Sequence, residues 1–324
     1  MGFNSVLKSK NLYLLYLLPF ILAAIAFLRF TLDGDGGIIC RENGLISFPF
    51  LNENQHLLWL KAAGMFVLLC LSFLIFFIAD RYKFLSRITV LPALIYALMS
   101  AGIICHYGVN NYLLAAFCMI VAIFRLQSAI VHSNSNAPVF GFGLFTCLAV
   151  LLCPKLVSLL LWAIVVLPFS GRANVKDLVA LFIGFFTTLF FTAAYYFWTD
   201  QLFELPAVFS ETLLAGEGFW RLMPEKLAAY IVFGVLIIVS LYNVIVNSST
   251  AIVAQRRGIF SMLSMLLFAG SSLFFIPFNC HGIMLILAIP LSYLFAQYFI
   301  SHRILWLGNV LFLLMLAACV WTIW

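Results

Sequence analysis

Two acidic residues, Asp33 and Asp35, stand among glycines in the stretch 29–44, RFTLDGDGGIICRENG, directly after the first long apolar run of the chain. A carboxylate can accept a proton from a nucleophile, and two neighbouring carboxylates can hold a divalent cation. The same Asp-Gly-Asp-Gly-Gly sequence is also typical of a flexible, solvated turn. Two interpretations therefore stay open: an active site in which Asp33 and Asp35 act as base or as metal ligands, or a polar loop.

Four basic residues are expected near the same side of the protein, and they are Arg29, Arg41, Lys155 and Arg221. Guanidinium and ammonium groups bind phosphate, and arginine does so in a bidentate geometry. These residues also have simpler explanations, because an arginine near a helix end commonly extends to the lipid headgroups, and a lysine can separate two short helices. A phosphate-binding site built from these residues is the functional hypothesis.

The composition indicates the environment in which these residues must work. The chain is 65% hydrophobic and 9% charged, with a mean hydropathy of +1.16. Apolar runs of about 18 or more residues recur along its length, as in membrane-spanning helices, whereas a membrane barrel would show short alternating segments. The sequence therefore predicts an all-α, polytopic transmembrane helix bundle, with residues 1–324 forming a single integral membrane domain.

Polar residues, Pro and Gly interrupt the apolar runs of the chain. The runs between these interruptions predict about eleven helices, within a range of about nine to twelve. The expected ranges are 12–31, 58–79, 88–105, 112–125, 139–152, 156–169, 178–198, 227–246, 259–276, 282–300 and 304–323. Those at 112–125, 139–152 and 156–169 are short for a full crossing, so one or two of them are expected to be re-entrant or broken.

Lys and Arg residues occupy alternate connections between the expected helices. Because cytoplasmic connections of membrane proteins are enriched in Lys and Arg, these connections and the N-terminus are expected to be cytoplasmic. The protein is thus predicted to be a multi-pass membrane protein. The basic residues concerned are Lys8, Lys10, Arg81, Lys83, Arg87, Arg125, Arg172, Lys176, Arg256, Arg257 and Arg303.

The carboxylates show the complementary distribution. Of the 11 Asp and Glu residues, all except Asp80 and Asp177 lie in the segments 32–57 and 199–226, which are the expected outer loops. In the second loop, apolar residues recur at nearly helical spacing, which predicts a short amphipathic helix on the outer membrane surface. Since its polar face is acidic, apolar burial or packing on the other outer loop must hold it there.

Arg125 interrupts an apolar stretch and raises a separate question. A charge at mid-depth in the bilayer costs about 2.5–3.5 kcal/mol on insertion scales, so a buried Arg125 would need a partner. Asp80 and Asp177, both expected near the cytoplasmic face, are the candidate partners, and a structural ion pair is the expected outcome.

The segment 136–169, NAPVFGFGLFTCLAVLLCPKLVSLLLWAIVVLPF, combines a Gly-x-Gly helix start with a Pro-Lys interruption between two apolar helices. This layout resembles the central helical hairpin of the type C membrane glycosyltransferases, which use polyprenol-phosphate sugars. The matching residues are Gly141, Gly143, Pro154 and Lys155. That family carries an essential carboxylate in the first outer loop, so the resemblance implies a catalytic role for Asp33 and Asp35.

The remaining helices, ending in ILAIPLSYLFAQYF at 286–299, are similar to an uncharacterised family of bacterial polytopic inner-membrane proteins. Three functions stay open: an envelope glycosyltransferase that uses a polyprenyl-phosphate-linked sugar, a noncatalytic membrane scaffold or partner subunit, and a lipid or solute transporter. The lipid bilayer is the expected partner, and a divalent cation is the expected cofactor if there is one. No nucleotide-binding motif appears, no nucleic-acid partner is expected, and the sequence identifies no protein partner.

Overall fold

The structure is a computed structural model that describes residues 13–32, 57–83, 85, 89–132, 135–214, 227–248, 253–275, 281–301 and 305–323. These residues form 12 α-helices and no β-strand, which confirms the all-α fold. The helices are α2 (Tyr13–Leu32), α3 (Leu57–Arg81), α4 (Leu91–Tyr107), α5 (Asn111–Val131), α6 (Ala137–Leu152), α7 (Ser158–Phe169), α8 (Val175–Trp198), α9 (Leu205–Leu214), α10 (Leu227–Ser248), α11 (Val253–Ser271), α12 (Met284–Ser301) and α13 (Leu305–Ile323). Short 3-10 turns are η3 (Pro154–Leu156), η4 (Leu202–Glu204), η6 (Ser272–Phe275) and η7 (His281–Ile283).

Each expected apolar run corresponds to a helix, and α9 lies within the segment that was predicted to hold an amphipathic helix. One boundary error concerns α5. The sequence analysis ended this helix at Arg125, whereas it continues to Val131. Arg125 interrupts the apolar pattern, but its side chain is exposed, so the helix continues through this position without burying the charge. The prediction that 112–125 is a short helix was therefore wrong.

Helices α3, α5 and α8 are those in the described part of the chain that are long and apolar enough to cross a membrane. Shorter apolar stretches occur in α2, α4, α6, α7, α10, α12 and α13. Local signals set several boundaries. The Asn110 side chain accepts a hydrogen bond of 2.8 Å from the Leu113 amide at the start of α5, and α4 and α6 both begin with a proline in their first turn.

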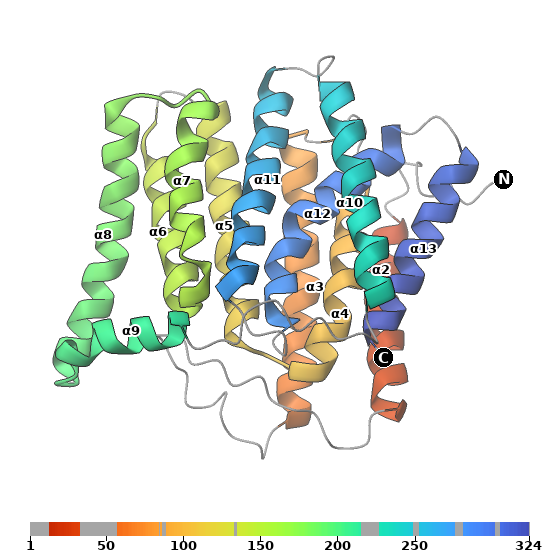
Figure 1. Cartoon of the computed structure of the whole chain (residues 1–324), viewed down its shortest axis with the longest axis horizontal. Helices are drawn as coiled ribbons and strands as arrows, with labels where there is room; N and C mark the ends of the chain where they lie inside the picture. Colours follow the sequence, from red (N-terminus) through yellow and green to blue (C-terminus); the bar gives the residue numbers. More distant parts are fainter. Residues whose placement is uncertain are drawn as a thin grey trace.

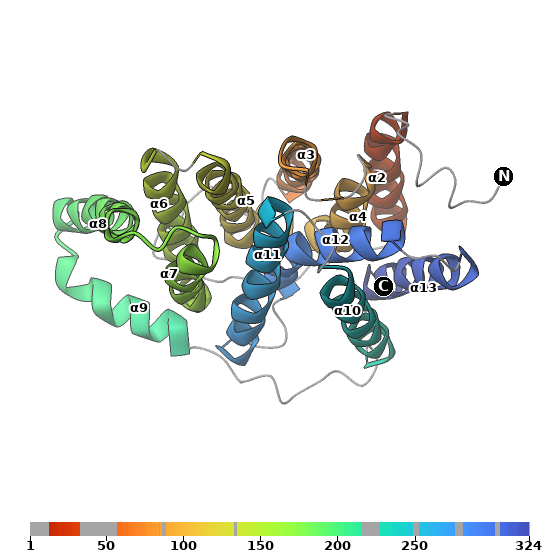
Figure 2. The ribbon, with the colours of Figure 1, turned by 90° about the horizontal axis from the view of Figure 1, so that it is seen from above.

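The long helices lie side by side and form a slab, whereas α9 lies crosswise at one end of the bundle (Figure 1). This end, which also carries η3 and the first residues of α5, is called the α9 end; the opposite end, with the connection between α7 and α8, is called the Arg172 end. Seen from above, α8 stands at one edge of the slab and α2 and α13 stand at the other (Figure 2).

Helix α12 forms the centre of the packing. Every residue from Leu285 to Ala296 is buried, and the helix contacts α4, α5, α10 and α11. Helix α8 is the opposite case, because large apolar side chains such as Phe186 and Phe190 are about two-thirds exposed, at 67% and 68%. An extended exposed apolar surface of this kind is unusual in a protein surrounded by water and is expected where lipid is the solvent.

Candidate functional site

Of the residues that the sequence assigns to a site, Asp33, Asp35, Arg41 and Arg221 lie outside the described residues. Arg29 belongs to α2, although its side chain is outside the described part. Lys155 is described in full. The tentative metal site at Asp33 and Asp35 thus stays a prediction, and the described residues contain no group of three or more His, Cys, Asp or Glu side chains that could hold a metal ion.

Lys155 lies in η3, the turn that joins α6 to α7 at the α9 end. Helix α6 ends at Cys153, which leaves the helical conformation with φ −137° and ψ 90°, and Pro154, which has no amide donor, then opens the turn. The three residues of η3 are buried, and Lys155 is only 5% exposed. A lysine that loses its water must have its charge compensated by other groups.

Helix α9 covers this turn. It contacts η3, and Leu205, Val208 and Phe209 pack against the core of the bundle, while Ser210 and Glu211 on its other face are exposed. Packing on η3 therefore holds α9 at the end of the bundle. The other outer loop, which was one of the two expected supports of this helix, lies outside the described residues. The exposed face remains acidic.

Ser158, at the start of α7, links the end of this turn to the C-terminal part of α11. Its hydroxyl donates to the Phe268 carbonyl at 2.8 Å and lies 2.7 Å from the Ser272 hydroxyl, in a contact in which either group can donate. Because η3 also contacts η6, which begins at Ser272, the turn that holds Lys155 is fixed from two sides. The turn is therefore packed into the bundle and is not a loop on the surface.

Arg29 and Lys155 are not brought together. Helix α2, which carries Arg29, stands at one edge of the slab, whereas α6, α7 and α9 lie towards the other, with α3, α4 and α5 between them (Figure 2). The helix that carries Arg29 packs on α3 and α4. These two cations therefore do not form one phosphate site through their helices.

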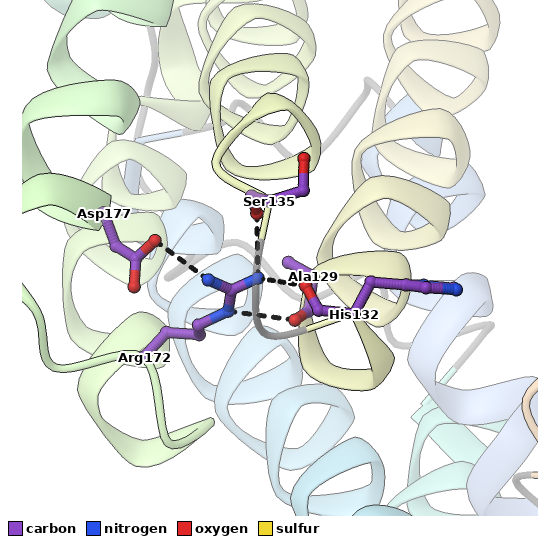
Figure 3. Close-up of polar contacts among 5 residues, drawn as sticks. All are labelled: Ala129, His132, Ser135, Arg172 and Asp177. Atoms are coloured by element: carbon purple, nitrogen blue, oxygen red, sulfur yellow. Dashed lines mark hydrogen bonds and ion pairs between the residues drawn. The ribbon is translucent and has the colours of Figure 1, made fainter.

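The sequence analysis missed a second charged cluster, at the Arg172 end (Figure 3). The Arg172 guanidinium donates from Nη1 to Asp177 Oδ1 at 3.1 Å, and the two side chains are 5% and 1% exposed. It also donates to the carbonyls of Ala129 at 2.9 Å, His132 at 2.5 Å and Ser135 at 2.9 Å. Arg172 thus joins the end of α5, the start of α6 and the first turn of α8.

Helix dipoles explain why these residue types occur there. The positive guanidinium lies at the C-terminus of α5, and the negative Asp177 lies in the first turn of α8, so each charge opposes the partial charge of a helix end. Four hydrogen bonds leave Arg172 little capacity for a ligand, which indicates a structural clamp. This pairing also corrects an expectation, because Asp177 pairs with Arg172 and not with Arg125.

Gly143, the second glycine of the Gly-x-Gly pair, has a packing role. A side-chain carbon at Gly143 would lie 2.5 Å from the Leu181 carbonyl oxygen, and one at Gly184 would lie 2.5 Å from the Phe140 carbonyl oxygen. Helices α6 and α8 therefore approach each other through glycine on both sides, as small residues allow in membrane proteins. The position of Gly143 in the resemblance is explained by helix contact.

Comparison of the chain with protein-family models, with curated proteins and with solved structures finds no match. The resemblance to the type C membrane glycosyltransferases thus rests on the residues of the sequence alone.

Proposed function

We propose that the chain is a multi-pass inner-membrane protein of the bacterial cell envelope, with a cytoplasmic N-terminus and a working surface at the α9 end. The separation of charge supports this orientation, because basic residues gather in the connections at the Arg172 end and carboxylates gather in segments 32–57 and 199–226. The lengths of α3, α5 and α8 and the exposed apolar face of α8 fit a surrounding bilayer.

At the α9 end we propose transfer of a sugar from a polyprenyl-phosphate donor. The observation that carries this proposal is the burial of Lys155 in a packed turn beneath α9. An ammonium group has three donors, so a phosphate oxygen can be bound alongside a protein partner. Because Arg29 stands at the other edge of the slab, Arg41 and Arg221 are the proposed additional phosphate ligands.

In the proposed reaction, Asp33 or Asp35 accepts the proton of an acceptor hydroxyl or amide. The acceptor atom bonds to the anomeric carbon while the bond from that carbon to the phosphate oxygen breaks. The electron pair of the broken bond stays with the polyprenyl phosphate, whose charge the cations stabilise. A divalent cation held by Asp33 and Asp35 would instead activate the acceptor.

A complementation experiment tests this proposal. Asp33→Asn, Asp35→Asn and Lys155→Gln variants are expressed in a deletion strain, and growth and the glycoconjugate profile are measured together with the amount of protein in the membrane. The matched control is Asp200→Asn, an exposed acid of the same predicted side that has no role in the proposed reaction. Failure of an aspartate variant at normal membrane level supports the enzyme, and full complementation by both aspartate variants overturns it.

Close packing of the described helices favours a second candidate, a noncatalytic membrane subunit. Several polar side chains inside the bundle bond to one another and not to a path for a solute, as when Gln127 donates to Ser261 at 3.0 Å and Trp162 donates to Ser264 at 3.0 Å. For such a subunit both aspartate variants complement, whereas charge reversal on the exposed face of α9, Glu211→Lys, abolishes co-purification of its partner.

A further inference from the structure

Arg125 is an exposed cation on the side of the bundle and not at its end. It lies on α5 about 9 Å before Val131, at a rise of about 1.5 Å per residue, and its side chain is exposed. In a bilayer that α5 crosses from end to end, this position would lie below the headgroup layer but within reach of it for a long side chain. A guanidinium there needs an anion or must extend to the headgroups.

Helix α6 provides the space for this side chain. A side-chain carbon at Gly141 would lie 3.3 Å from both Cδ and Nε of Arg125, so the stem of the arginine lies against the α6 backbone at this glycine. The side chain is thereby held in the groove between α5 and α6, where these helices make extensive contact. Arg125 is thus positioned by the fold and is not a freely moving surface residue.

The described part of the protein offers Arg125 no carboxylate. Asp177, one of the two expected partners, is bound by Arg172. Asp80, the other, is exposed near the end of α3, and no ion pair joins it to Arg125. An anion that compensates Arg125 within a bilayer would therefore come from outside these residues.

A second cation flanks the same part of α5. The guanidinium of Arg81, the last residue of α3, lies over the rings of Phe77 and Phe124, at 5.7 Å from each centroid. Arg81 approaches α5 from the α3 side at Phe124, whereas Arg125 lies on the α6 side against Gly141, so the two exposed cations flank α5. Helices α3, α5 and α6 follow one another along this side of the slab (Figure 2).

We propose that Arg81 and Arg125 bind the anionic headgroup of a phospholipid on the surface of α3, α5 and α6. Guanidinium groups bind phosphate in a bidentate geometry, and basic sites between membrane helices select acidic headgroups. Phe77 and Phe117, which are 47% and 42% exposed, offer apolar surface for the acyl chains on α3 and α5. The inference rests on the proposed membrane location, but it does not depend on the proposed reaction.

Native mass spectrometry of the purified, delipidated protein tests this site. Full-length wild type in dodecyl maltoside is titrated with phosphatidylglycerol, with phosphatidylcholine or with inorganic phosphate. Wild type is expected to retain phosphatidylglycerol about tenfold better than phosphatidylcholine, and Arg125→Gln is expected to lose about that factor, as for one charge-assisted contact. Lys176→Gln, which removes an exposed cation at the same end of the bundle, is the control and should retain the lipid as wild type does.

Several results overturn the proposal. Equal retention of the two lipids by wild type excludes a headgroup site, whether or not any variant folds. Equal retention of phosphatidylglycerol by Arg125→Gln and wild type excludes Arg125 as the ligand. Displacement of the lipid by millimolar inorganic phosphate identifies a free-phosphate site instead. If Arg125→Gln fails to insert, Arg125→Lys keeps the charge, and its retention of the lipid selectivity is required. Complementation results at Asp33 and Asp35 leave these outcomes unchanged, so the two proposals fail separately.

Discussion

The guanidinium of Arg172 and the carboxylate of Asp177 form a buried ion pair of 3.1 Å across the connection between α7 and α8. The Asp177 Oδ2 atom has no hydrogen-bond partner among the described residues. The negative charge of this carboxylate is therefore paired with Arg172 through Oδ1. Since the same guanidinium also binds carbonyls of Ala129, His132 and Ser135, loss of Arg172 affects several helices at once.

Arg172→Met is therefore expected to destabilise the protein by about 3–5 kcal/mol, as for removal of one partner of a buried ion pair. Thermal unfolding in detergent, followed by circular dichroism, measures this loss. The control is Arg256→Met at an exposed site on α11, for which a change within about 0.5 kcal/mol is expected.

The double variant Arg172→Met, Asp177→Leu separates the two roles of the arginine. Removing Asp177 relieves the uncompensated charge, but the three carbonyls remain without their donor, so only part of the stability should return. Full recovery in the double variant would show that the ion pair alone matters and that the carbonyl contacts contribute nothing.

Gly184→Ala is expected to destabilise the contact of α6 with α8. The new carbon would lie 2.5 Å from the Phe140 carbonyl oxygen and 2.8 Å from the Leu144 amide nitrogen, so the helices must move apart, at a cost of about 1–3 kcal/mol. Gly270→Ala is the matched control, because nothing lies within 4 Å of the added carbon. Alanine there should leave the stability of the protein within about 0.5 kcal/mol of wild type. Equal effects at both positions would contradict the packing argument.

Interhelical hydrogen bonds along α11 should contribute modestly. Trp162→Phe keeps an aromatic ring that packs on Phe142, at a centroid distance of 5.4 Å in wild type, but it removes the bond to Ser264. A double-mutant cycle with Ser264→Ala is expected to give a coupling energy of about 0.6 kcal/mol, the average for such bonds inside membrane proteins. A coupling near zero in thermal unfolding would mean that Trp162 acts by packing alone.

Apolar patterning predicted the helices well because an apolar segment in lipid must satisfy its backbone hydrogen bonds internally, and a helix does so within one continuous run. It failed at Arg125, since an interruption by one charge looks the same whether a helix stops or carries the charge on its exposed side. The Arg172 clamp was beyond prediction for a related reason. Its partners are three backbone carbonyls, which every residue has, and the packing of α5, α6 and α8 brings them to one point.

The candidate site shows the same division between local and tertiary information. The Pro-Lys pair predicted the break at Pro154, because proline lacks the amide that would continue the helix. That Lys155 is buried beneath α9 depends on a contact between residues far apart in the chain, and no spacing reports it. Likewise, the sequence predicted that Arg29 and Lys155 lie on the same side of the membrane. Only the packing of the helices shows that α2 and the turn between α6 and α7 lie far apart across the slab (Figure 2).

The proposed orientation can be tested with cysteines at the two ends of the bundle. Phe203 is 96% exposed beside α9, and Ser135 is exposed in the connection between α5 and α6 at the Arg172 end. Single cysteines at these positions, after replacement of the 8 native cysteines, are treated with a membrane-impermeant maleimide in intact spheroplasts. We expect labelling of Phe203→Cys before permeabilisation and of Ser135→Cys only afterwards, because the basic connections should be cytoplasmic. The reverse pattern would put Lys155 on the cytoplasmic side, where a donor that is used outside the cell membrane could not reach it, and the proposed reaction would then be wrong even if the helix bundle is correct.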